Sequence, residues 1–304
     1  MTKDEIKYER RIVAFIDILG FKEIVKQSEQ DTTKIELLYS VLDFLKNWET
    51  SDKWDLKFVE IEEDAQKKGV DNSDIRGKTN TTSFSDSIVV SVKVGENVNE
   101  MTSTLVVNLA YIGAILIEKG ILFRGGLTIG NILHNDNGTV FGQALIDAYH
   151  LETKSAKYPR IVLSDKLIRE LNYPIETKRN RFPYHQYIDR FEDGCIGFHQ
   201  MIYYQVIESW TEMTSEKMID SLAKVRKTII NGLDNSFENP DVFEKYKWLK
   251  EQYNKLIILS DFDFNNKTQE NIKMKIRDLN DGISGQNIHY SYTDNFYNQS
   301  RKKE

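Results

Sequence analysis

Two aspartates could bind a cation: one stands in apolar sequence, where a carboxylate is costly unless it has a partner, and the other stands in hairpin-forming sequence. Asp17 lies within VAFIDILGF, residues 13–21, whose other eight positions are apolar or glycine. Asp86 lies within FSDSIV, at the expected tip of a hairpin. Because an unpaired buried charge is strongly destabilising, the Asp17 carboxylate needs a cation or hydrogen-bond donors. Mg²⁺ and Mn²⁺ take such oxygen ligands together with substrate phosphates, so the pair predicts a metal site. The alternative is that Asp17 caps a turn and that Asp86 is an ordinary hairpin residue.

The elements that must position these aspartates follow from the hydrophobic pattern. Residues 11–19 predict a central strand buried on both faces, and residues 81–92 predict the hairpin. A helical pattern follows Gly20 to about residue 47, and its first N–H groups would favour a polyphosphate. Further strands are expected at 121–130, 138–143, 160–164 and 197–207, and further helices at 98–119, 144–153, 165–171, 213–235 and 240–260.

This order of elements predicts an α+β fold in which helices pack on a mixed sheet. Residues 1–207 are expected to form the catalytic domain, and residues 208–304 a helical extension with a flexible tail. Residues 50–80 suggest a strand with a long loop.

Composition excludes several classes of protein. The net charge of −6 argues against a nucleic-acid partner. Cys195 is the single cysteine, so neither a disulfide framework nor a thiolate metal cluster is expected. The charged start is unlike a signal peptide, and the apolar stretch at 105–117 is expected to be too short to span a bilayer. A soluble, cytoplasmic protein without membrane insertion is therefore expected.

Four segments in chain order resemble the class III nucleotide cyclase catalytic domain, over about residues 11–165. They are FIDILGFKEIV, FSDSIVVSV, FRGGLTIGNIL and VFGQALIDAYHLE. The resemblance implies a ferredoxin-like palm and a homodimer with its active sites at the interface. It implies that Asp17, Asp86 and the carbonyl of Ile18 bind two Mn²⁺ or Mg²⁺ ions per site, and that Asp17 is paired with metal rather than with an arginine. Arg124 would contact phosphate, and Phe21 would belong to the substrate site.

The chain departs from the pattern of that family at three positions. Ser85 replaces the glycine of the usual Gly-Asp hairpin, and Ile146 replaces an asparagine of the last motif. His150 falls on the position of the arginine that stabilises the transition state. It is either a weaker catalytic substitute or a helix-face histidine without a catalytic function.

The positions that select the base in the family carry Thr82 and Thr139, which match neither the adenylate nor the guanylate pattern. This resembles the pyrimidine cyclases of Pycsar antiphage systems. The resemblance implies conversion of UTP or CTP to the cyclic mononucleotide, which activates a separate effector. Tyr39 is either part of the base pocket or a core tyrosine. The remaining alternatives are an adenylate cyclase with an atypical base pocket and a non-catalytic nucleotide-binding domain. The sequence offers no partner for His134 or Asp147.

Overall fold

The computed structural model describes residues 6–46, 79–95, 98–171, 187–207, 215–236, 238–259 and Ile276. The chain divides into two compact units, Met1–Tyr111 with Leu122–His199, and Ile112–Ile121 with Gln200–Glu304. The strand and loop expected at 50–80 lie outside the described residues up to residue 78, as does the polar tail apart from Ile276.

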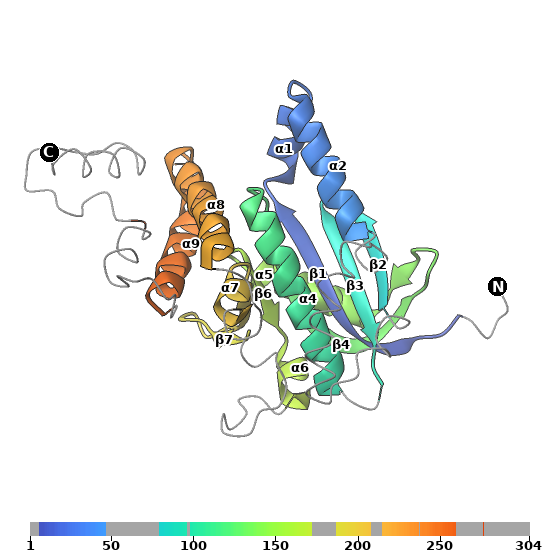
Figure 1. The fold of residues 1–304 in the computed structure, drawn as a ribbon. Coiled ribbons are helices and arrows are strands. Elements are labelled where there is room, and N and C mark those ends of the chain that lie inside the picture. Colours follow the sequence, from blue (N-terminus) through green and yellow to red (C-terminus); the bar gives the residue numbers. More distant parts are fainter. Residues whose placement is uncertain are drawn as a thin grey trace, which may run out of the picture. The chain divides into compact units, whose positions relative to one another are not determined.

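The first unit is built on a mixed sheet with β1 near its centre (Figure 1). The sheet order is β2-β3-β1-β4-β6-β8-β7, and β5 pairs with the end of β4. β1 is antiparallel to both β3 and β4, whereas β4 and β6 are parallel. The strands are β1 (Glu9–Leu19), β2 (Thr79–Phe84), β3 (Ser87–Lys93), β4 (Leu122–His134), β5 (Val140–Phe141), β6 (Arg160–Leu163), β7 (Asp189–Arg190) and β8 (Ile196–His199).

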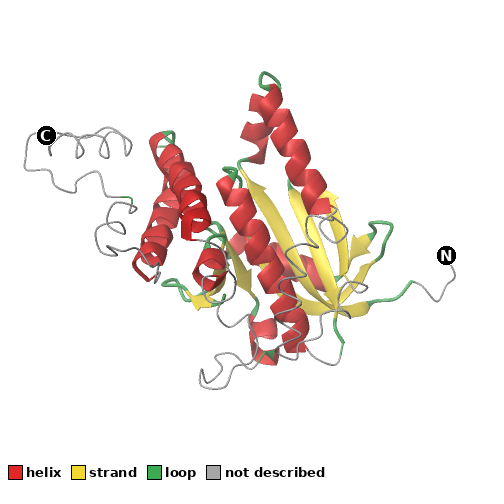
Figure 2. Ribbon diagram, in the orientation of Figure 1, coloured by secondary structure: helices red, strands yellow, loops and turns green. Residues whose placement is uncertain are grey.

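Helices pack on this sheet, which confirms the predicted α+β class (Figure 2). The helices that begin in the first unit are α1 (Phe21–Ser28), α2 (Thr32–Lys46), α4 (Val98–Glu118), α5 (Gln143–Lys154) and α6 (Asp165–Glu170), and α1 contacts chiefly α2. The helical pattern after Gly20 forms two helices rather than one. The break falls at Asp31, whose carboxylate accepts a hydrogen bond from the N–H of Thr33 at 3.0 Å and so begins α2.

The second unit contains the end of α4 and three further helices, α7 (Ile202–Ile207), α8 (Ser215–Asp234) and α9 (Pro240–Leu259). The helices predicted at 213–235 and 240–260 are confirmed. Gly232 of α8 lets α9 approach closely, because a Cβ atom there would lie 2.1 Å from the Tyr246 ring.

The strand predicted at 197–207 is wrong beyond its first residues. β8 ends at His199, and α7 begins at Ile202. A continuous apolar run is compatible with a buried strand or a buried helix, and periodicity does not separate the two. Here tertiary contacts decide: Tyr204 is buried, and its hydroxyl donates to the Glu118 carboxylate at 2.6 Å.

α4 contains a long apolar segment. By length and composition alone, Met101–Glu118 is able to cross a membrane, so the expectation that the apolar stretch is too short is not upheld. However, 76% of that segment is buried within the protein, as in the core helix of a soluble protein.

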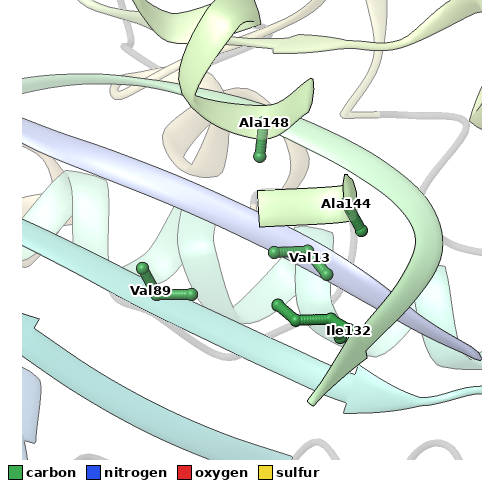
Figure 3. Packing of buried hydrophobic residues seen from close by; sticks show 5 residues of the cluster. All are labelled: Val13, Val89, Ile132, Ala144 and Ala148. Atoms are coloured by element: carbon green, nitrogen blue, oxygen red, sulfur yellow. The ribbon is translucent and has the colours of Figure 1, made fainter. Parts of the chain in front are cut away.

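A core cluster joins α5 to the sheet in the first unit. Val13, Val89 and Ile132 from three strands meet Ala144 and Ala148 of α5. Figure 3 shows the two alanine side chains pointing from α5 toward the strands. Because alanine is small, the helix backbone lies close to the sheet.

Two glycines of β4 complete this close approach. A Cβ atom on Gly126 would lie 2.3 Å from the carbonyl oxygen of Ala148 and 2.5 Å from the Leu151 Cβ atom. A Cβ atom on Gly130 would lie 3.3 Å from that of Ala144. Alternate residues of a strand share a face, so Arg124 lies on this same face, next to Gly126. The two glycines of β4 are therefore a packing requirement of α5.

The two glycines give a matched pair of substitutions. Gly126→Ala places a methyl group against helix backbone and should lower the free energy of unfolding by about 2–3 kcal/mol. Gly130→Ala meets only a methyl group and should cost about 1 kcal/mol or less. Urea denaturation of both variants measures the difference. Equal losses of unfolding free energy in the two variants would contradict the close approach of α5 at Gly126.

Candidate active site

The end of β1 and the tip of the β2–β3 hairpin meet, and they bring the two aspartates to one place. Asp17 stands opposite Ser87 of β3, directly after the turn that contains Asp86. The N–H of Ile18 donates to the carbonyl oxygen of Asp86 at 2.9 Å. Ser85 begins this two-residue turn with a φ of 56°. Glycine adopts that conformation without strain, which explains in physical terms why a glycine suits the position.

Arg124 lies between two carboxylates on the same face of the sheet. It stands opposite Asp17 in the register of β1 and β4, and its Nε atom is 3.6 Å from the Asp17 Oδ2 atom. The same Nε atom is 2.5 Å from the Oε1 atom of Glu152, a side chain only 2% exposed. The expectation that Asp17 has no arginine partner is therefore wrong. The register of β1 and β4 places Arg124 beside Asp17, and this register cannot be inferred from the sequence.

Glu152 is the site residue that sequence reasoning missed. It comes from α5, two turns beyond Ala144, on the face that packs against β4. Ala144, Ala148 and Glu152 are the buried residues of that helix. A charged residue that continues a stripe of buried alanines at intervals of four is the signal that would have found it.

Carboxylates outnumber cations at this end of the sheet. Burial raises the pKa of Glu152 to about 7, although Arg124 opposes the rise, and the charges of Asp17 and Asp86 add to it. Burial also raises the pKa of Asp17, against the opposing effect of Arg124 and with the help of Asp86. One guanidinium thus does not offset the acidic groups around it.

This donor set fits a hard divalent cation. Asp17, Asp86 and the Ile18 carbonyl offer oxygen ligands at a place with an excess of negative charge. In the part of the chain that the structure describes, no group of three or more acidic, histidine or cysteine side chains is arranged to hold a metal ion. Mg²⁺ and Mn²⁺ sites with one or two carboxylates take further oxygens from substrate phosphates and water, so two aspartates are sufficient.

The start of α1 adjoins the same strand end. Gly20 leaves β1 with a φ of 73° and leads directly into Phe21, the first residue of α1, which is half-buried. No side chain of the described residues caps this helix. The N–H groups of an uncapped helix start favour an anion such as phosphate.

The other candidate residues lie farther along the sheet or on helix surfaces. Thr82 is half-buried on β2, and Thr139 is exposed in the turn between β4 and β5. Tyr39 is 70% exposed on α2, so the alternative of a core tyrosine is wrong. His150 and Ile146 are exposed on α5.

The two residues for which the sequence offered no partner both have one. Asp147 accepts a hydrogen bond from the side-chain amide of Gln143 at 2.8 Å and pairs with Lys166 at 3.3 Å. His134 is buried, and both of its ring nitrogens form hydrogen bonds, to Ser91 and to Thr82.

No protein-family model matches the chain, and no curated protein does. Similar solved structures include the catalytic core of a rhodopsin-guanylyl cyclase with converted specificity in complex with ATPalphaS. It is 15% identical, with a TM-score of 0.36 over 64% of this chain and 97% of that chain. The monomeric guanylyl cyclase domain of the RhoGC fusion protein from the aquatic fungus Blastocladiella emersonii is 15% identical, with a TM-score of 0.35 over 63% and 95%. An adenylate/guanylate cyclase/hydrolase from Silicibacter pomeroyi is 16% identical, with a TM-score of 0.31 over 62% and 95%. Sequence identities and TM-scores of this size do not establish a function, which depends on the residues of this chain.

The raised pKa of Glu152 predicts a pH-dependent stability. The folded state holds a proton up to about pH 7 that the unfolded state releases near the ordinary value of 4.5, so stability falls as the pH rises through this window. Glu152→Gln removes the titration. Relative to the unsubstituted protein, the variant should gain roughly 2–3 kcal/mol between pH 5 and pH 8, at about 1.4 kcal/mol per pKa unit.

Urea denaturation at both pH values measures this gain. Glu36→Gln, which neutralises an exposed carboxyl of α2, is the matched control. A gain that is absent, or equal in the control, would contradict the account of Glu152.

Proposed function

We propose that this protein is a nucleotide cyclase that converts UTP or CTP to the 3′,5′-cyclic mononucleotide and pyrophosphate. The observation that carries the proposal is the meeting of Asp17 and Asp86 at the end of β1, beside Arg124 and the uncapped start of α1. Carboxylates, one guanidinium and a helix start are the groups that position a triphosphate with its metal ions.

Asp17, Asp86 and the Ile18 carbonyl would hold two Mn²⁺ or Mg²⁺ ions. When bound, these ions lower the pKa of the ribose 3′-hydroxyl and offset the charge of the triphosphate. The 3′-oxygen then bonds to the α-phosphorus, while the bond from that phosphorus to the oxygen bridging to the β-phosphate breaks. The hydroxyl proton leaves to solvent, and pyrophosphate departs.

Arg124 is the proposed phosphate contact of the chain itself. Its pairing with buried Glu152 holds the guanidinium on the face of the sheet next to Asp17. Because the side chain remains 24% exposed, it is accessible to an incoming anion. A positive group fixed before the substrate binds needs little reorganisation during the reaction.

The choice of a pyrimidine rests on Thr82 and Thr139, which carry none of the charged groups that read a purine in the resembled family. The same resemblance supports a function in bacterial antiphage defence, with a cyclic-nucleotide-activated effector as the downstream partner. A cytoplasmic location fits this function, in which the product must reach a separate effector.

A homodimer with two active sites at its interface is part of the proposal. Residues of the α5 side expose apolar surface that a second copy would cover, with Ile146 48% and Tyr149 47% exposed. In such a dimer, His150 on the same helix would approach the site of the partner subunit.

Two alternatives stay open. A non-catalytic nucleotide-binding domain is favoured by Ile146 and His150, which stand where the resembled family has asparagine and arginine. An adenylate cyclase with an atypical base pocket would keep the same metal site. Both alternatives give different results from the proposal in the following assay.

Incubation with each of the four nucleoside triphosphates and Mn²⁺ tests the reaction. The expected product is cyclic UMP or cyclic CMP, and Asp17→Asn should lower its rate at least about a hundredfold, because a metal ligand is lost. Asp147→Asn, which neutralises a carboxylate on α5 away from the strand end, is the control. Dominant cyclic AMP would support the adenylate alternative, and product formation that Asp17→Asn leaves unchanged would overturn the catalytic assignment.

The dimer predicts a coupled loss of assembly and activity. Ile146→Glu places a charge in the proposed interface and should shift the protein toward monomer, with a parallel loss of product formation. Light scattering after size exclusion measures the mass. Ile35→Glu, at a similarly exposed isoleucine of α2, is the control and should stay dimeric. A monomeric but fully active Ile146→Glu variant would contradict the shared active site.

A further inference from the structure

A chain of hydrogen bonds runs across the α5 side of the sheet, at a distance from the aspartates. The Nη1 atom of Arg11 donates to the Ser91 hydroxyl at 3.1 Å, and that hydroxyl is 2.8 Å from the Nδ1 atom of His134. The Nε2 atom of His134 is 2.9 Å from the Thr82 hydroxyl, which in turn donates to the Gly138 carbonyl at 3.2 Å. Ser91 is fully buried, and His134 is 5% exposed.

The direction of each bond follows from its first member. An arginine donates and never accepts, so the Ser91 oxygen accepts from Arg11 and its single proton is available to His134. Nδ1 of His134 is then an acceptor, and the ring proton sits on Nε2. Nε2–H donates to the Thr82 oxygen, whose own proton goes to the Gly138 carbonyl. This assignment satisfies every member of the chain.

The opposite tautomer leaves groups unpaired. If Nδ1 of His134 donated, the Ser91 proton would have no acceptor among the described residues, inside a fully buried site. Nε2 would then draw the Thr82 proton away from Gly138. A doubly protonated ring is also disfavoured, since burial and the charge of Arg11 lower the pKa of His134 to about 4, against a weaker opposing effect of Asp136.

Thr82 shares a face of the sheet with the candidate active site. It stands opposite Val89 of β3, and Val89 stands opposite Phe15 of β1. Directly paired residues point to the same side, and Asp17 lies two residues beyond Phe15. Two strand spacings and a two-residue rise separate Thr82 from Asp17 by roughly 12 Å. In the proposed binding mode, the α-phosphate of the nucleotide lies beside Asp17 and its base lies toward Thr82.

We propose that the chain from Arg11 to His134 makes Thr82 a hydrogen-bond acceptor toward the substrate base, so that the site binds the proposed pyrimidine through an N–H donor of that base. This inference rests on the proposed function. A hydroxyl oxygen has two lone pairs and one proton. His134 occupies one lone pair and Gly138 the proton, and the second lone pair remains for the ligand.

The required donor is the ring N3–H of uracil or the exocyclic amino group of cytosine. A base that turned a carbonyl or a bare ring nitrogen to Thr82 would face oxygen lone pairs and would lose its hydrogen bond. His134 and Ser91 act through Thr82 and are therefore positioning residues.

Donor-blocked nucleotides test this specificity. The test measures kcat/KM in the presence of Mn²⁺ for UTP against 3-methyl-UTP and for CTP against N4,N4-dimethyl-CTP. The unsubstituted protein should prefer the parent nucleotide by at least about tenfold, the value of one hydrogen bond. Thr82→Val keeps the shape of threonine without the hydroxyl, and Ser91→Ala removes the donor that fixes His134. In both variants, the preference for the parent nucleotide should fall about tenfold.

Thr128→Val is the matched control. It removes another fully buried hydroxyl of the same sheet, one that donates to Ser164 at 2.8 Å, and it should keep the preference. If Thr82→Val discriminates as well as the unsubstituted protein, Thr82 does not read the base and the inference is overturned.

Histidine ¹⁵N NMR tests the relay without any activity. The His134 ring should be the neutral Nε2–H tautomer between pH 5 and pH 8, and Ser91→Ala should shift it toward a mixture. An Nδ1–H tautomer in the unsubstituted protein would overturn the inference. If no triphosphate is cyclised, the proposed function fails separately. Calorimetric binding of the same parent and blocked nucleotides then tests whether Thr82 reads the base.

Discussion

The contact between α5 and β4 at Gly126 is the constraint on which the rest of the site depends. Without a side chain at that position, the helix backbone lies directly on the strand. The next turn of the helix then places Glu152 next to Arg124, and the strand register places Arg124 next to Asp17. A packing requirement and an electrostatic arrangement thus have one cause, because any outward movement of α5 would separate the ion pair.

The α5 side of the sheet divides into three zones along the strands. Acidic groups with one arginine occupy the end near Asp17, and an apolar cluster around Val13 holds α5 in the middle. At the other end, a buried polar chain links Ser91 and His134 to Thr82. Hydrogen bonds fix the polar zone, whereas the acidic zone holds unbalanced charge.

Much of the fold could be predicted from sequence, because strand and hairpin signals are local. The central strand and the hairpin at Asp86 are such cases. Interactions between elements distant in sequence could not be predicted. Strand register and the approach of a helix determine the partners of Glu152 and His134, and these partners are distant in sequence. The strand prediction for the apolar residues after His199 failed for a related reason, because apolar sequence alone does not distinguish a strand from a helix.

The central claim is that Asp17 and Asp86 together hold metal ions with a triphosphate. The most direct test is electron paramagnetic resonance of Mn²⁺ with a non-cyclisable 3′-deoxy-UTP, in the unsubstituted protein, Asp17→Asn and Asp86→Asn. The account predicts a protein-bound Mn²⁺ signal that depends on the nucleotide and is lost or strongly weakened in each variant. Mn²⁺ that binds equally well after neutralisation of either aspartate would contradict it.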